Sequence, residues 1–250
     1  MPILTVFPRF LSGPLAAFAC SGLLVFSAPA SAQTTSAQIA AHSVPDTLAQ
    51  RVMACTLCHG QEGRATNAGY FPRIAGKPAG YLYNQLRNFR EGRRQNPGMS
   101  QLLDPLSDAY LRDIAQYFAS LDLPYPPPQT ANAPAAELAR GEALIRQGDA
   151  QRQIPACVQC HGDALTGRNP AIPGLIGLPR DYLIGQLGAW QTGQRHAGAP
   201  DCMARIAQAL SAQDVGALAT WLSAQAVPTQ AHAVAASPQA LPMDCGSGLP

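Results

Sequence analysis

The chain has 250 residues, of which 13% are charged and 47% hydrophobic, and its formal net charge is only +2. This balance gives no electrostatic basis for binding nucleic acid or an anionic membrane surface, so we expect no nucleic-acid partner. Because the hydrophobic residues are dispersed along the chain, intrinsic disorder and a multi-span membrane protein are also poor interpretations. The length fits two modest domains.

Residues 1–32 have the features of a signal peptide. Arg9 precedes a broken apolar stretch over 11–26, and an Ala-x-Ala triplet over 30–32 supplies a cleavage site. We therefore predict export to the periplasm and no retained membrane span. A retained anchor and a lipoprotein attached through Cys20 are the alternatives, but the apolar stretch is shorter than the roughly 20 residues that cross a bilayer. Export leaves six cysteines in an oxidising compartment.

An internal repeat organises the rest of the chain. The segment Cys-Thr-Leu-Cys-His-Gly at 55–60 returns 102 residues later as Cys-Val-Gln-Cys-His-Gly at 157–162. A Tyr-Leu-x-x-Gln-Leu segment at 81–86 returns at 182–187, and Met99 is matched by Met203. Such even spacing indicates a tandem duplication of one domain.

The repeat and the composition together predict five segments. They are a signal peptide over 1–32, an N-terminal domain over 33–123, a Pro-rich linker over 124–134, a C-terminal domain over 135–224 and an Ala/Pro-rich tail over 225–250. Inside each repeat, apolar residues recur at helical spacing, and a serine precedes the last helix as a natural N-cap (Ser107 and Ser211). No alternating strand run of convincing length is present, so the predicted fold is all-α.

The two Cys-x-x-Cys-His motifs predict covalent haem attachment. Two cysteines on one helical turn add their thiols across the vinyl groups of one haem, and the adjacent histidine then becomes the proximal iron ligand. The residues that we assign to the two sites are Cys55, Cys58 and His59, and Cys157, Cys160 and His161. The chain is thereby predicted to carry two covalently bound haem c groups.

The repeat also nominates a sixth ligand for each iron. Met99 and Met203 lie 40 and 42 residues after their histidines, each ahead of the serine-capped helix, where a loop can cross the far face of the haem. Simple packing is the alternative role for both methionines. His196 is a rival ligand for the second iron, although a surface position suits it better.

Zinc and thiol-redox chemistry are the alternatives for these cysteines. A tetrahedral zinc site needs a second ligand pair within a short stretch, whereas 98 residues separate the two cysteine pairs. A thioredoxin-like site belongs to a βαβ pattern that this chain does not have.

The motifs together resemble the dihaem cytochrome c4 family, which consists of two class I cytochrome c domains in tandem. The resemblance extends over about residues 46–224. It implies haem c with His/Met ligation, haem propionates near the interface of the domains, and a proline carbonyl that holds each histidine ring, at Pro72 and Pro173. Cys202 and Cys245 depart from the family pattern, and we predict a disulfide between them that ties the tail to the second methionine loop.

These features predict a periplasmic electron carrier of a respiratory chain. Because His and Met would fill both axial positions of each iron, no position is open for a substrate, and we do not expect an enzyme. The expected partners are redox proteins, such as a membrane cytochrome complex, an oxidase or a dehydrogenase. The alternatives are a cytochrome subunit of an exported dehydrogenase and a catalytic dihaem protein such as a peroxidase. Arg87, Arg90 and Arg94 share one helix face, which is either solvated, meets an acidic partner or offsets haem propionates.

Overall fold

The computed structural model describes residues 46–66, 70–236 and 240–247. The predicted signal peptide over 1–32 lies outside these described residues. The first repeat contains α1 (Leu48–Arg51), α2 (Met53–His59), the short helix η1 (Gln61–Gly63), α3 (Ala79–Arg90), α4 (Pro97–Leu103) and α5 (Asp108–Ala119). The second contains α6 (Ala135–Arg146), η2 (Ala150–Arg152), α7 (Cys157–His161), β1 (Gly167–Arg168), β2 (Ile172–Pro173), α8 (Arg180–Gln191), α9 (Cys202–Ala209) and α10 (Ala212–Ser223).

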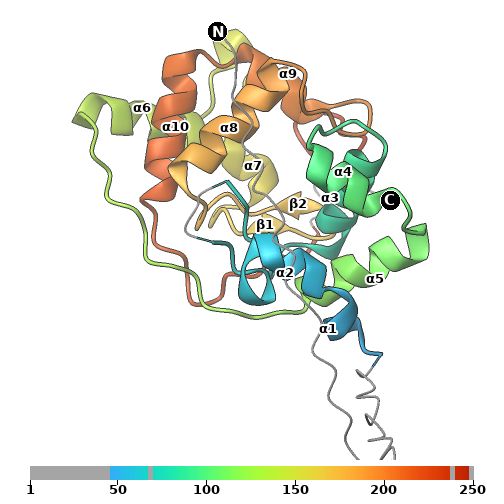
Figure 1. Cartoon of the computed structure of the whole chain (residues 1–250). Helices are drawn as coiled ribbons and strands as arrows, with labels where there is room; N and C mark the ends of the chain where they lie inside the picture. Colours follow the sequence, from blue (N-terminus) through green and yellow to red (C-terminus); the bar gives the residue numbers. More distant parts are fainter. Residues whose placement is uncertain (1–45, 67–69, 237–239, 248–250) are drawn as a thin grey trace, which may run out of the picture. The chain divides into compact units, whose positions relative to one another are not determined.

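The helices of the two repeats correspond, and the predicted all-α class is confirmed (Figure 1). The only described sheet is the antiparallel pair β1–β2, in which Gly167 pairs with Pro173 and Arg168 with Ile172. Both predicted serine caps are present: Ser107 accepts from the amide of Tyr110, and Ser211 forms a capping box with Asp214. None of the helices in the described ranges has the length and apolar character needed to cross a bilayer.

Each repeat builds its own hydrophobic core. In the first repeat, α3 packs against α5, and the buried cluster is Val52, Leu82, Ile114, Ala115 and Phe118. In the second repeat, α10 packs against both α6 and α8 (Figure 1). Gly141 permits the close approach of α6 to α10, because a Cβ there would lie 2.4 Å from the carbonyl oxygen of Ala217. No buried cluster of the described residues mixes the two repeats, so we describe them as two modules.

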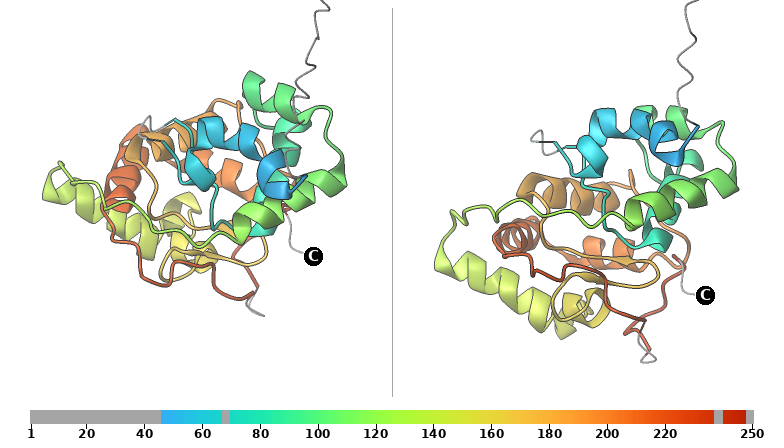
Figure 2. Two further views of the ribbon diagram at one scale, coloured as in Figure 1. Left: turned by 60° about the horizontal axis from the view of Figure 1, so that its bottom comes forward. Right: turned by 90° about the horizontal axis from the view of Figure 1, so that it is seen from below.

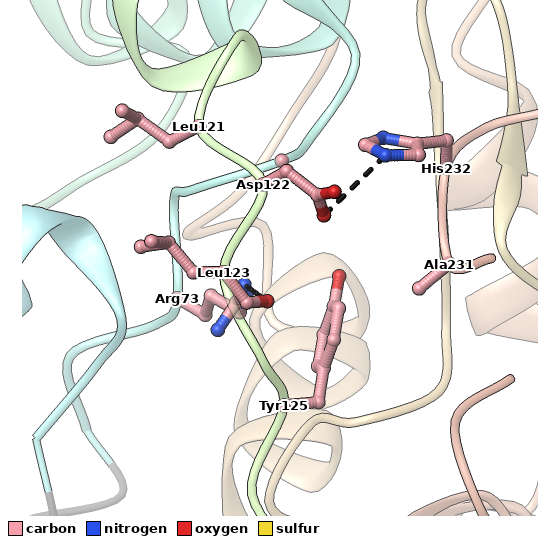
Figure 3. Close-up of a pocket in the computed structure, with 8 residues that line it drawn as sticks. Arg73, Leu121, Asp122, Leu123, Tyr125, Ala231 and His232 are labelled. Carbon is pink, nitrogen blue, oxygen red and sulfur yellow. Dashed lines mark hydrogen bonds and ion pairs between the residues drawn. The ribbon is translucent and has the colours of Figure 1, made fainter. Parts of the chain in front are cut away.

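The Pro-rich linker crosses extended from α5 to α6 (Figures 1 and 2). Arg73 of the first module donates to the carbonyl oxygens of Leu123 (2.5 Å) and Pro124 (3.0 Å), and its guanidinium lies 3.9 Å from the centre of the Tyr125 ring (Figure 3). A tail residue, His232, lies 3.4 Å from the carboxylate of Asp122. The linker is therefore anchored along its length and does not behave as a loose tether.

Asp214 joins three elements of the second module. Its side chain is 6% exposed and accepts from Nε of Arg140 (2.9 Å), a guanidinium nitrogen of Arg152 (2.7 Å) and the hydroxyl of Ser211 (2.8 Å). Burial alone raises the pKa of this carboxyl, but the hydrogen bonds from Arg152, Ser211 and Arg140 outweigh it and hold the pKa well below its usual range. The carboxylate stays charged at neutral pH and fixes α10 against α6 and η2.

We expect Asp214→Asn to lower the free energy of unfolding at pH 7 by about 2 kcal/mol, because Arg140 and Arg152 lose the more buried of their two carboxylate partners and keep only Asp149. A lowered pKa stabilises the fold above the pKa of the unfolded carboxyl, and this stabilisation is lost as the pH falls below about 4. The difference between wild type and variant should therefore shrink between pH 4 and pH 2. The free energy of unfolding of both proteins is measured at each pH by denaturant titration, with circular dichroism as the signal. Asp181→Asn, at a carboxylate that is 90% exposed, is the control.

Candidate haem sites

The first Cys-x-x-Cys-His motif forms α2 and ends it. Gly60 follows with φ +75°, and a Cβ at this position would lie 2.2 Å from the carbonyl oxygen of Ala65, so the turn after the histidine requires glycine. His59 is 8% exposed, and its Nδ1 lies 2.9 Å from the carbonyl oxygen of Pro72. Because a carbonyl only accepts, Nδ1 carries the proton, and Nε2 keeps a free lone pair for a metal.

The second motif forms α7 with the same geometry. His161 is 7% exposed, and its Nδ1 lies 2.7 Å from the carbonyl oxygen of Pro173. Both hydrogen bonds to proline carbonyls that the resemblance implied are therefore present. Burial lowers the pKa of each histidine, and nearby positive charges add to this effect, namely Arg94 at His59 and Arg168 with Lys77 at His161. Both imidazoles are thus held neutral, which is the form that ligates iron.

The four motif cysteines take part in no disulfide: Cys55, Cys58, Cys157 and Cys160. Burial raises the pKa of Cys157 to about 11 and also raises the pKa of Cys55 and Cys160. Catalytic and zinc-binding cysteines need a stabilised thiolate, and these environments disfavour it. Free protonated thiols beside a neutral histidine suit haem attachment better than thiol redox chemistry.

The two methionines lie in helices, where we expected loops. Met99 is in the first turn of α4 and Met203 in the first turn of α9. The side chain of Asn96 accepts from the amide of Met99, and that of Asp201 accepts from the amide of Ala204, so each methionine lies in an N-capped helix that the sequence analysis did not predict. Met99 packs against Phe89 and Leu103 of its own module, and Met203 packs against Trp190.

Three buried polar atoms of the second module have no hydrogen-bond partner among the described residues: Nη2 of Arg152, which pairs with the carboxylate of Asp149 as an ion pair, Nε1 of Trp190 and Nε of Arg168. Buried donors of this kind are normally paired. Trp190 contacts Met203, and the charge of Arg168 acts on His161, so both donors belong to the second candidate site. A haem carboxylate is an acceptor that would satisfy them.

Two buried arginines connect the modules. Arg94 and Arg195 are 9% and 5% exposed and pair as an antiparallel backbone bridge, flanked by hydrogen bonds from Gln95 N to Gln194 O and from His196 N to Arg93 O. Their guanidinium groups share acceptors from both modules: Tyr81, Gln85, Tyr182 and Gln186. Neither guanidinium forms an ion pair with a carboxylate of the described residues.

A pair of buried positive charges without a counter-ion is costly unless an anion completes the site. The thiols, the oriented histidines, the unpaired donors and these two guanidinium groups therefore fit two haem groups with their propionates at the interface. The prediction that Arg94 shares a helix face with Arg87 and Arg90 was wrong, because α3 ends at Arg90 and Arg94 lies beyond it. Arg87 pairs with Glu91 and Arg90 with Asp108 at the surface, whereas Arg94 turns into the interface. His196 has an exposed side chain, as its surface reading predicted.

Two helical modules, each with a haem-attachment motif on one short helix and a methionine in the first turn of another, define a dihaem c-type cytochrome. No protein-family model that was searched matches the chain. The chain is 38% identical over 172 residues to the thiosulfate dehydrogenase electron acceptor of Thiomonas intermedia, covering 68% of this chain and 78% of the relative. It is 35% identical over 186 residues to cytochrome c4 of Pseudomonas aeruginosa, covering 73% and 90%.

Among solved structures, reduced cytochrome c4 from Pseudomonas stutzeri matches with a TM-score of 0.61 and 31% identity, covering 70% of this chain and 95% of that one. The chain belongs to the cytochrome c4 family. It is a dihaem electron-transfer cytochrome with two covalently bound haem c groups, as the sequence predicted. The predicted disulfide between Cys202 and Cys245 is also present.

Proposed function

We propose that the chain carries electrons with both irons six-coordinate, bound by His59 and Met99 in the first module and by His161 and Met203 in the second. The observation that carries this proposal is that both histidines have the same environment. Each imidazole is buried and neutral, and a proline carbonyl orients its ring. Two methionines at equivalent places in the repeat supply the second donor. With both axial positions filled by protein, no position is open for peroxide or oxygen, and the chain is not an enzyme.

When bound, each haem supplies a one-electron Fe(III)/Fe(II) couple. The methionine thioether is a soft donor and favours the ferrous state, which raises the potential relative to ligation by two histidines. The proline carbonyls hold the imidazole planes, so ligand orientation does not change between oxidation states. The positive charges of Arg168 and Lys77 near His161, and of Arg94 near His59, would oppose the additional charge of ferric iron at the two sites.

We propose that residues 1–32 direct export and that the mature protein works in the periplasm, with redox proteins of a respiratory chain as partners. The name of the relative from Thiomonas intermedia supports an exported dehydrogenase as the electron donor. On that basis a subunit of such a dehydrogenase complex is the second candidate function. Co-purification of the tagged chain with a dehydrogenase would distinguish a stable subunit from a diffusing carrier.

The purified protein is expected to contain two haem groups per chain that acid-acetone does not extract, because thioether bonds hold them. The ferrous protein should not change its spectrum under carbon monoxide, since both axial positions are filled. Haemochrome quantification and visible spectroscopy measure these two properties. A high-spin ferric signature, or a carbon monoxide adduct at one haem, would contradict the closed coordination and favour a peroxidase-like protein instead.

A further inference from the structure

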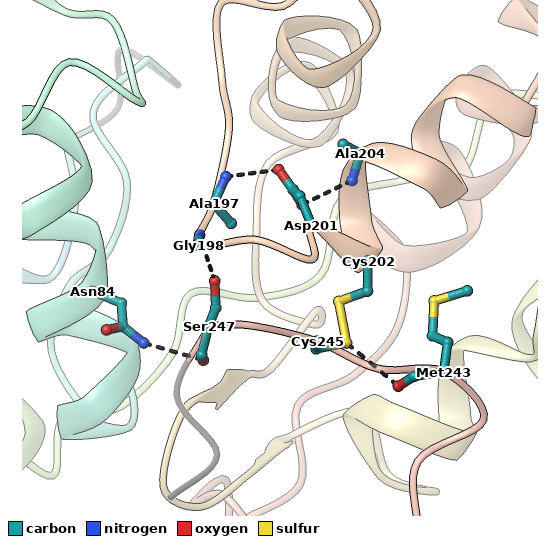
Figure 4. Close-up of a disulfide and its surroundings, with 9 residues drawn as sticks. All are labelled: Asn84, Ala197, Gly198, Asp201, Cys202, Ala204, Met243, Cys245 and Ser247. Atoms are coloured by element: carbon teal, nitrogen blue, oxygen red, sulfur yellow. Dashed lines mark hydrogen bonds between the residues drawn. A yellow bond between two sulfur atoms is a disulfide. The ribbon is translucent and has the colours of Figure 1, made fainter.

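The end of the chain is tied to the start of α9. Cys202 is the first residue of this helix and forms a disulfide with Cys245, with 5.1 Å between the two Cα atoms (Figure 4). Met203, the proposed iron ligand, is the next residue. We call residues 241–247 the tail strap. Any displacement of the strap is transmitted through one covalent bridge to the residue beside Met203.

Three further hydrogen bonds fix the strap, two to the loop that leads into α9 and one to α3. Gly246 N donates to the carbonyl oxygen of Pro200 (2.9 Å), and Gly198 N donates to the hydroxyl of Ser247 (3.1 Å). Nδ2 of Asn84, on α3 of the first module, donates to the carbonyl oxygen of Ser247 (3.1 Å), as Figure 4 shows. A Cβ at Gly246 would lie 1.9 Å from the carbonyl oxygen of Ala199, so backbone packs directly on backbone.

The strap also lines a groove of the second module, together with residues close in sequence to the haem-attachment motif and to Met203. One open groove is lined by Leu241 to Asp244 of the strap, by Pro200 and Arg205 around the start of α9, and by Ile154 to Ala156 and Gln159 around α7. The same segment of the tail thus lies beside the segment before α7 and beside the start of α9. The strap is held by these contacts and its hydrogen bonds as well as by its disulfide.

In the described part of the first module no such strap is present, and the sequence explains the difference. Arg94 and Arg195 are equivalent bridge residues, yet four residues separate Arg94 from Met99 and seven separate Arg195 from Met203. Each additional residue of loop has conformational entropy that must be lost when the methionine is held in place. The longer loop therefore needs restraints that the shorter one, which enters α4 directly through Asn96 and Pro97, does not need.

We propose that the tail strap and the Cys202–Cys245 disulfide position Met203 as the ligand of the second iron, while Met99 needs no equivalent device. The inference rests on the proposed function, because it takes Met203 as a ligand. Cys202 and Cys245 are positioning residues, which act on the iron only through the placement of Met203. The two haem groups consequently differ in how their methionine bonds depend on the thiol state of the protein.

The test uses the full-length holoprotein with Cys202→Ser and Cys245→Ser combined, so that no free thiol is left to bind iron. The long-wavelength absorption band that reports the methionine–iron bond in the ferric state should fall towards half of its wild-type intensity. One of the two one-electron waves in a redox titration should move to lower potential, and the other should stay. His232→Ala, in the tail but outside the strap, is the matched control and should retain the full band.

A chemical version avoids the folding of the variant. The disulfide of purified wild-type protein is reduced and alkylated, the haem groups are reoxidised, and a second sample is reoxidised without alkylation. The alkylated sample should lose up to half of the band, and the second sample should recover it as the disulfide reforms. Full band intensity and two unchanged potentials after alkylation would overturn the positioning role.

Met203→Ala separates this inference from the proposed function. If this variant keeps the full band, Met203 is not a ligand, and the proposed function fails in its second site. If Met203→Ala loses half of the band while the disulfide-free protein keeps all of it, the ligand assignment holds and only the role of the strap is refuted. A loss of both methionine bonds in the disulfide-free protein would indicate general unfolding and would also overturn selective positioning.

Discussion

Met203→Ala is expected to lower the potential of one haem on the order of 0.2 V, well within the roughly 0.8 V range that axial ligands control, and to leave the other potential unchanged. Met99→Ala should lower the potential of the other haem and leave the first potential unchanged. The thioether stabilises ferrous iron, so its loss favours the ferric state. Because each methionine packs within its own module, the two effects should be independent and additive.

Potentiometric titration with visible spectroscopy measures both potentials and the long-wavelength band together. Each single variant should lose half of the band, and the double variant should lose all of it. Met53→Ala is the control, because Met53 is exposed and has no counterpart in the second repeat. A single variant that removes the whole band, or none of it, would contradict one methionine per iron.

Arg94→Gln combined with Arg195→Gln should lower both potentials, each by on the order of 1 kcal/mol at an effective dielectric constant of about 20. The two buried guanidinium groups lie where the modules meet, and positive charge near both haem groups opposes their oxidation. Glutamine keeps polar hydrogen bonding but removes the charge. Arg195 should contribute more than an exposed arginine would, because water screens it little.

The same titration, repeated at low and high salt, tests this pair. Arg87→Gln is the matched control. Arg87 lies on α3, as does Gln85 of the interface, but its side chain pairs with Glu91 at the surface. Both haem potentials of the Arg87→Gln variant should stay at their wild-type values, and any small shift should disappear at high salt. Unchanged potentials in the double variant would mean that the propionates lie away from the two arginines.

Most of the correct sequence-based predictions came from the internal repeat. Motif spacing and helical stripes were sufficient for two helical modules and the serine caps, because these depend on local sequence, whereas the proline carbonyls at the two histidines were implied by the resemblance to the family. The starts of α4 and α9 were missed, since Asn96 and Asp201 act as caps only once the chain before them is extended. The strands β1 and β2 have two residues each, too few to show a period.

The interface was the main feature that the sequence reasoning did not find. Arg94 matched the spacing of a solvated face, and only its contacts across the repeat show that it is buried. A signal was present nonetheless, since Arg94 and Arg195 recur at the same 101-residue offset as the tyrosines and glutamines that they contact. No such signal pointed to the unpaired indole N–H of Trp190, because its burial without a hydrogen-bond partner depends on tertiary packing.

The bridge between Arg94 and Arg195 has one more consequence. Each residue meets its own counterpart on the other module, which is the arrangement that two identical subunits adopt around a twofold axis. The linker holds both copies in one chain, so their association does not depend on protein concentration. Dilution in a large compartment cannot part the two redox centres, and every molecule that reaches a partner brings a pair of them.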